Sequence, residues 1–185
     1  MKIPVLLGTS RKGNFSKSVA QYLHGKLSNV SEIDSPWLDL GEINLPVMLD
    51  RLDHADVPPP GLADWNEVIK TSDALLIVVP EYKNGIPGAL KNLLDYLPAQ
   101  VFRYKPIAIC TVSSGDFGGL NCLSQLRLVA LACGGMPIPD KLLVSSVKEL
   151  FSPDGLPTDP KFSGRSDTFL DELLKYARAF QALNT

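Results

Sequence analysis

The feature that most constrains the fold is a continuous apolar run from Ala74 to Val79 (ALLIVV). It lacks the alternation of polar and apolar residues that marks a half-exposed strand, so it predicts a strand that is buried on both faces. Such strands occur in parallel sheets that are covered by helices on both sides. Segments with helical periodicity precede and follow the run, at 61–72 and 86–97. The sequence therefore predicts βαβ units and a parallel sheet.

The same alternation of strands and helices continues along the rest of the chain. Further strands are predicted at 2–7, 30–40, 106–112 and 137–144, and further helices at 14–27, 117–133 and 166–182, the last with Ser166 or Asp167 as its cap. We expect the proline-rich and turn-rich segments 41–60 and 151–165 to be surface loops, with a turn at Asp154-Gly155. The length of 185 residues suits a single domain, 1–185.

Composition excludes several classes of function. A formal net charge of −2 gives no basic field, so we expect no nucleic-acid partner and no anionic membrane surface. No apolar stretch approaches the roughly 20 residues that cross a bilayer, and the first apolar run is too short for a signal peptide. The three cysteines are odd in number and lie in apolar runs, which argues against disulfides and a metal site. We expect a cytoplasmic protein.

The first chemistry-bearing segment is 8–16 (GTSRKGNFS), between a predicted strand and a predicted helix. Its polar side chains are three hydroxyls, one amide and two cations, from Thr9, Ser10, Ser16, Asn14, Arg11 and Lys12. Short donors, a guanidinium and free N–H groups at a helix N-terminus suit a phosphate dianion. The spacing fits neither the Walker loop nor the G-x-G-x-x-G fingerprint, which favours a mononucleotide phosphate. The alternative is an ordinary polar turn with a serine cap.

Two further segments follow the third and fourth predicted strands, at 80–88 (PEYKNGIPG) and 113–119 (SSGDFGG). In open parallel sheets, ligands bind beyond the carboxyl ends of the strands, where the strand order reverses. For the order 2-1-3-4-5 that point lies between the first and third strands, so the segments at 8–16 and 80–88 border one crevice. Glycines at 113–119 allow a flat ligand to approach the backbone closely. A proline-rich turn and a flexible loop are the alternatives for the two segments.

The three segments together resemble one known family. GTSRKGNFSKSVA, PEYKNGIPGALKNLLDYL and SSGDFGGLNCLSQLRLVALACGG are similar, in this order, to the phosphate loop, the proline-glutamate-tyrosine loop and the third flavin loop of the NAD(P)H-dependent FMN reductases. FSPDGLPTD resembles the C-terminal segment of that family. The resemblance implies an α/β fold of the flavodoxin-like type, a three-layer sandwich with a five-stranded parallel sheet of order 2-1-3-4-5. It also implies FMN as cofactor, NAD(P)H as co-substrate, and a homodimer or homotetramer.

The resemblance assigns roles to residues as well. Residues expected to hold the FMN phosphate are Thr9, Ser10, Arg11, Asn14, Phe15 and Ser16. Residues expected to line the isoalloxazine edge, mostly through backbone groups, are Pro80, Glu81, Tyr82, Lys83, Asn84 and Gly85. Residues expected to close the other side are Ser113, Ser114 and Gly115. Lys83 departs from the family, which has asparagine after the tyrosine, and could favour the anionic reduced flavin or meet the 2′-phosphate of NADPH.

The implied function is an oxidoreductase that passes hydride from NAD(P)H through FMN to a small acceptor, such as a quinone, a flavin, an azo dye or a metal oxyanion. We expect no catalytic side chain and no metal ligand, because the flavin itself carries the chemistry. One alternative is a flavodoxin-type electron carrier, which the weak net charge disfavours. Another is a phosphate-binding regulatory module without a redox role.

Overall fold

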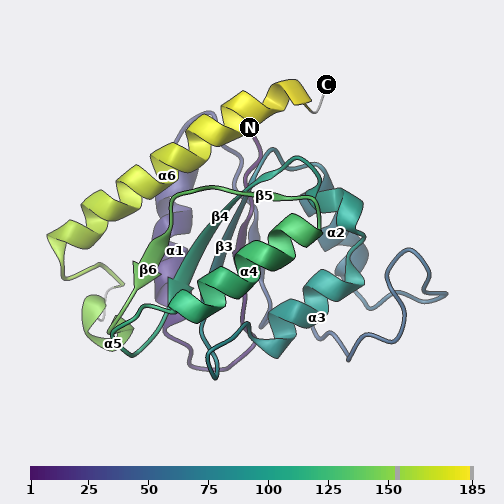
Figure 1. Ribbon diagram of the computed structural model, residues 1–185, viewed down its shortest axis with the longest axis horizontal. Coiled ribbons are helices and arrows are strands. Elements are labelled where there is room, and N and C mark those ends of the chain that lie inside the picture. The colour runs from purple at the N-terminus through teal and green to yellow at the C-terminus, as the bar shows by residue number, and fades with distance from the viewer. Residues whose placement is uncertain (153–154, 184–185) are drawn as a thin grey trace.

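The computed structural model describes residues 1–152 and 155–183, and its centre is a parallel sheet (Figure 1). In spatial order the strands are β2 (Trp37–Asp39), β1 (Val5–Leu7), β3 (Leu75–Pro80), β4 (Pro106–Val112) and β5 (Met136–Pro137), with β6 (Leu142–Val144) also paired to β4. Each pair of neighbours is parallel. The predicted strand order 2-1-3-4-5 is confirmed.

The last predicted strand, 137–144, is two short strands instead of one. β5 pairs with the start of β4 and β6 with its end, and the chain leaves the ladder between them. Pro139 lies in this gap and has no N–H group to donate to β4. The carbonyls that the gap frees are used by Arg127 on the neighbouring helix, which donates to the oxygens of residues 138, 139 and 140 at 3.0, 2.6 and 3.2 Å.

Helices cover both faces of the sheet. The helices on one face are α1 (Ser16–Ser28) and α6 (Pro160–Phe180), and those on the other are α2 (Leu62–Lys70), α3 (Gly88–Tyr96) and α4 (Leu120–Ala132) (Figure 1). Side chains alternate along β1, so Val5 and Leu7 pack under α1 and α6 while Leu6 packs under the other helices. The structure confirms the predicted three-layer sandwich.

The C-terminal helix begins six residues before the predicted start. Asp159 caps α6 by accepting the N–H of Lys161 at 2.9 Å, and Pro160 occupies the first helical position. Ser166, the predicted cap, is fully buried inside the helix and donates to the carbonyl of Phe162 at 2.8 Å. Asp154 of the predicted turn lies outside the described residues. Among the helices described, none is both long and apolar enough to cross a bilayer.

Two short elements were not predicted: the 3₁₀ helix Ala99–Phe102 and the helix α5 (Val147–Leu150) directly after β6. The predicted C-terminal helix 166–182 ends in a 3₁₀ turn, Gln181–Leu183, after α6. The segment 41–60 is a loop, as predicted, and Asn92 of α3 fastens it. The Asn92 side chain accepts the N–H of Met48 at 2.9 Å and donates to the carbonyl of Pro46 at 2.7 Å.

Candidate functional site

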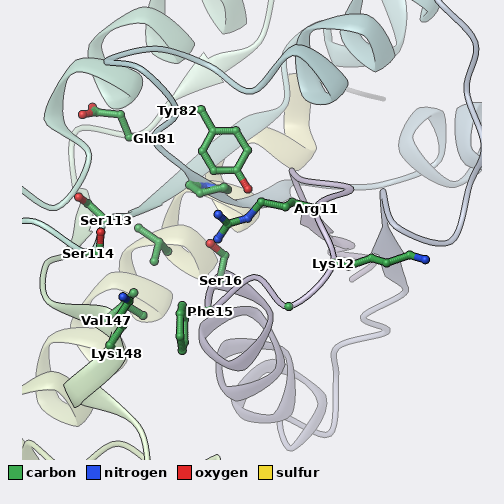
Figure 2. A pocket seen from close by; sticks show the side chains of 13 residues that line it. Arg11, Lys12, Phe15, Ser16, Glu81, Tyr82, Ser113, Ser114, Val147 and Lys148 are labelled. Carbon is green, nitrogen blue, oxygen red and sulfur yellow. The ribbon is translucent and has the colours of Figure 1, made fainter.

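The three predicted loops meet around one open cavity of about 460 Å³ at the carboxyl ends of β1, β3 and β4 (Figure 2). Its wall is formed by Arg11, Lys12, Gly13, Phe15 and Ser16 of the first loop, Pro80, Glu81 and Tyr82 of the second, and Val112, Ser113 and Ser114 at the third, with Val147 and Lys148 of α5. The other predicted site residues are not among those that line the cavity: Thr9, Ser10, Asn14, Lys83, Asn84, Gly85 and Gly115.

The first loop packs closely against its neighbours at Gly8 and leads into the N-terminus of α1 at the cavity. A Cβ on Gly8 would lie 3.0 Å from a methyl carbon of Leu90, so only glycine fits there without displacement. Asn14 accepts the N–H of Lys17 at 2.9 Å and thereby caps the first turn of α1. The N–H of Ser16 has no acceptor within the helix, since the first N–H groups of any helix lack one. The positive end of the α1 dipole therefore faces the cavity.

Two cations of the cavity lie over aromatic rings. The Arg11 guanidinium is 5.4 Å from the centre of the Tyr82 ring, and the Lys148 ammonium is 5.8 Å from the centre of the Phe15 ring. Within the described residues, neither cation forms an ion pair with a carboxylate. The Lys12 side chain extends away from the others in Figure 2. Two uncompensated cations and a helix N-terminus make the cavity electropositive.

Lys148 is a cavity residue that no pattern in the sequence indicates. It belongs to α5, a single turn of helix that is too short to show a hydrophobic period. The turn is anchored to the third loop because the N–H of Val147 donates to the carbonyl of Ser113 at 3.2 Å. This hydrogen bond brings Lys148, which follows the last strand, to the same cavity as Arg11, which follows the first.

The second loop is a tight turn. Tyr82 and Gly85 exchange backbone hydrogen bonds of 3.1 and 3.0 Å, and both central residues have positive φ, +51° at Lys83 and +60° at Asn84. These are the features of a type I′ turn. Lys83 and Asn84 therefore occupy the exposed tip, and Lys83 does not reach the cavity wall. The Tyr82 hydroxyl lies 2.8 Å from the buried hydroxyl of Thr9, which ties the second loop to the first.

The carboxylate of Glu81 turns away from the cavity toward α4 (Figure 2). It accepts the N–H of Cys122 at 2.9 Å, in the first turn of that helix. The helix begins after Gly119, which has no side chain for capping, so Glu81 supplies the cap from another segment. Burial, and then the negative charge of Glu81, raise the pKa of the Cys122 thiol to about 12. The thiol is therefore protonated at neutral pH.

The third loop requires glycine at two positions. Gly118 and Gly119 have φ of +60° and +82°, and a Cβ on Gly119 would lie 2.9 Å from the Cβ of Thr111. The Thr111 hydroxyl donates to the carbonyl of Gly118 at 2.7 Å, which holds the backbone against β4. At the other end of the loop, the Ser113 hydroxyl accepts the N–H of Gly115 at 3.0 Å. The loop therefore presents small residues and backbone to the cavity.

The donors around the cavity are hydroxyls, backbone N–H groups, the Arg11 guanidinium and the ammonium groups of Lys12 and Lys148. Glu81 is the single carboxylate among the described residues of its wall, and it is engaged by α4. Within the same described part of the chain there is no group of three or more His, Cys, Asp or Glu side chains that could hold a metal ion. The site is thus equipped to bind an anion beside an aromatic ring.

Comparison with known proteins identifies the family. The family model for NADPH-dependent FMN reductase matches residues 1–149. An NADPH azoreductase of Bacillus sp. strain OY1-2 is 29% identical over 147 residues, which is 80% of this chain and 78% of that protein. A quinone reductase of Escherichia coli K12 is 33% identical over 145 residues, 74% of this chain and 72% of that protein.

The solved structures agree with this relationship. FerB of Paracoccus denitrificans, described as a flavoenzyme NAD(P)H:(acceptor) oxidoreductase, superposes with a TM-score of 0.76 at 27% identity, over 95% of this chain and 98% of that one. The resemblance that the three loop motifs carry is confirmed by these matches. The family model spans all three loops and most of the chain, so this protein belongs to the NADPH-dependent FMN reductase family.

Proposed function

We propose that the FMN of this NAD(P)H-dependent reductase binds in the cavity at the ends of β1, β3 and β4, and that its electrons pass to a quinone or an azo compound. The observation that supports this site most strongly is the convergence of Arg11, Lys148 and the N-terminus of α1 beside the Tyr82 ring. An anion that also carries a flat ring matches this combination of groups.

The residues present fit FMN in their chemistry. Ser16, the α1 N-terminus and the Arg11 guanidinium are suitable donors to a phosphate, with Lys148 as a second cation. Thr9, Ser10, Asn14 and Phe15 would act mainly by shaping this loop. A volume of about 460 Å³ lies within the range of roughly 300–1,000 Å³ that is usual for small-molecule sites.

The ring system would lie between the second and third loops. The turn 80–85 and the segment 113–115 would contact it largely through backbone groups, since the Glu81 carboxylate is held by α4 and the Lys83 side chain lies at the exposed tip. When bound, FMN would supply the redox chemistry between NAD(P)H and the acceptor. The chain itself binds, orients and covers the cofactor, and we assign no catalytic side chain.

The proposed acceptor class follows from the open cavity and from the relatives. Their names include quinone reductase and azoreductase, and both kinds of substrate are flat and conjugated. Steady-state NADPH and NADH oxidation should be measured with a quinone, an azo dye, free FMN and chromate in parallel. The proposal requires the quinone or the azo dye to give the highest kcat/KM. A higher value for chromate or free FMN would assign the enzyme to another acceptor, and no turnover with any of them would contradict the reductase function.

Assembly and location are part of the proposal. We propose that the chain is a single domain, 1–185, that forms a cytoplasmic homodimer or homotetramer. Leu128 and Leu131 support this, because they leave an apolar surface exposed on α4. Light scattering of the purified protein should give two or four times the chain mass of 20.1 kDa. Leu128→Glu should shift that mass toward the monomer, and a monomeric wild-type chain would contradict this part of the proposal.

A further inference from the structure

Helix α4 contacts the second loop at two points on one face. The N–H of Cys122 donates to Glu81 at 2.9 Å, and the side-chain amide of Gln125 donates to the carbonyl of Asn84 at 2.9 Å. Cys122 and Gln125 are three residues apart, so both lie on the same side of the helix. The two bonds hold the beginning and the tip of the turn 81–85.

Each of the two hydrogen bonds stabilises a segment of the backbone. Helix α4 lacks a capping side chain at Gly119, and a carboxylate at the N-terminus both accepts a free N–H and complements the helix dipole. At the tip, two successive non-glycine residues have positive φ, a conformation that must be held by its surroundings. The packing is close as well, because a Cβ on Gly85 would lie 3.1 Å from Oε1 of Gln125.

We propose that Glu81 and Gln125 are positioning residues, which clamp the second loop onto α4 so that its backbone faces FMN correctly. Glu81 acts through Cys122 on α4, and Gln125 acts through the carbonyl of Asn84. The clamp is a property of the chain alone, whereas its effect on FMN rests on the proposed function. In this role the hydrogen bond that Glu81 accepts holds the loop in place, and the negative charge of Glu81 strengthens that bond.

The clamp is tested first on the chain without FMN. Amide hydrogen exchange, resolved by NMR, should show the Cys122 N–H exchanging about tenfold faster or more in Glu81→Ala, because a charge-assisted hydrogen bond is lost. Glu81→Gln keeps an oxygen acceptor and should restore most of the protection. Glu67→Ala serves as the matched control, since Glu67 is exposed on α2 and pairs with Lys70 at 3.5 Å, away from the second loop. Unchanged exchange in Glu81→Ala would overturn the clamp.

The positioning role is tested on FMN binding and on the visible spectrum of the bound flavin. Glu81→Ala and Gln125→Ala should each raise the FMN Kd about tenfold and alter the bound spectrum, with Glu81→Gln close to wild type. The double variant should lose less than the product of the two single losses, because both residues hold one loop. Gln125→Ala alone keeps the test valid if Glu81→Ala does not fold.

The outcomes distinguish failure of the positioning role from failure of the proposed function. If the wild-type chain binds FMN and both alanine variants bind it equally well, the positioning role is wrong while the proposed function stands. If the wild-type chain does not bind FMN, the proposed function fails and the positioning role fails with it, whatever the exchange data show.

Discussion

The hydrogen bond between Thr9 and Tyr82 joins the first and second loops, and its removal should destabilise the FMN-free chain by an amount that depends on which partner is changed. The two hydroxyls lie 2.8 Å apart, and Thr9 is 1% exposed while Tyr82 is half-buried. Tyr82→Phe leaves the Thr9 hydroxyl buried, and its remaining partner in the described part of the chain is the N–H of Arg11, at 3.3 Å. A buried hydroxyl that loses its partner costs about 1–3 kcal/mol.

Thr9→Val should cost less, about 1 kcal/mol, because it leaves no buried hydroxyl and the Tyr82 hydroxyl can turn to water. The double variant should be about as stable as Thr9→Val alone, so the coupling energy should be as large as the Tyr82→Phe cost, about 1–3 kcal/mol. Urea unfolding of the four FMN-free chains measures this, with unchanged m-values as the control for two-state behaviour. A coupling energy below about 0.3 kcal/mol would refute the link between the loops.

Three further predictions follow from single sites. Gly119→Ala should lower the free energy of unfolding by about 2 kcal/mol or more, because φ at this residue is +82° and the added Cβ would meet β4. Gly25→Ala, in α1 with free space around the added Cβ, should raise it by about 0.5–1 kcal/mol. Equal effects of the two variants in thermal unfolding would contradict this. Lys148→Met should raise the FMN Kd about tenfold at low salt, and Lys12→Met should raise it much less, as measured by quenching of flavin fluorescence. The reverse order would contradict the role of Lys148 as the second cation for the phosphate. Burial lowers the pKa of Lys105 from its usual 10.5, so as the pH rises toward 10.5 the folded chain releases a proton that the unfolded chain still holds. The wild type should therefore gain stability relative to Lys105→Met over this pH range. A difference in urea midpoints that stays constant with pH would contradict this.

The sequence predicted the sheet and the meeting of the three loops, because both follow from local patterns. Buried strands show as apolar runs, and the carboxyl ends of parallel strands must share one edge. The start of α6 was missed although Asp159 and Pro160 form a recognised start signal, since polar residues and Gly164 interrupt the apolar period that follows. The division of β5 from β6 depends on tertiary contacts, above all those of Arg127, and no local pattern contains them.

Side-chain directions within the site could not be predicted from the sequence. Glu81 and Lys83 flank Tyr82 in the motif, yet the structure directs Glu81 to α4 and places Lys83 at the exposed tip. The direction of Glu81 depends on the missing cap at Gly119. The position of Lys83 depends on the type I′ turn, which the pair Lys83-Asn84 predicts less clearly than Asn-Gly would. Lys148 reaches the cavity only because α5 docks on the third loop.

The proposed function requires that this cavity hold FMN and that NAD(P)H reduce it. The most direct measurement is an anaerobic titration: the chain is loaded with FMN, desalted, and followed by its visible spectrum while NADPH, and in a second sample NADH, is added. We expect flavin absorbance that stays with the protein and bleaches with at least one of the two nucleotides, and we expect an Arg11→Met variant to retain less flavin. A wild-type chain that emerges from desalting without flavin, or whose bound flavin neither nucleotide bleaches, would contradict it.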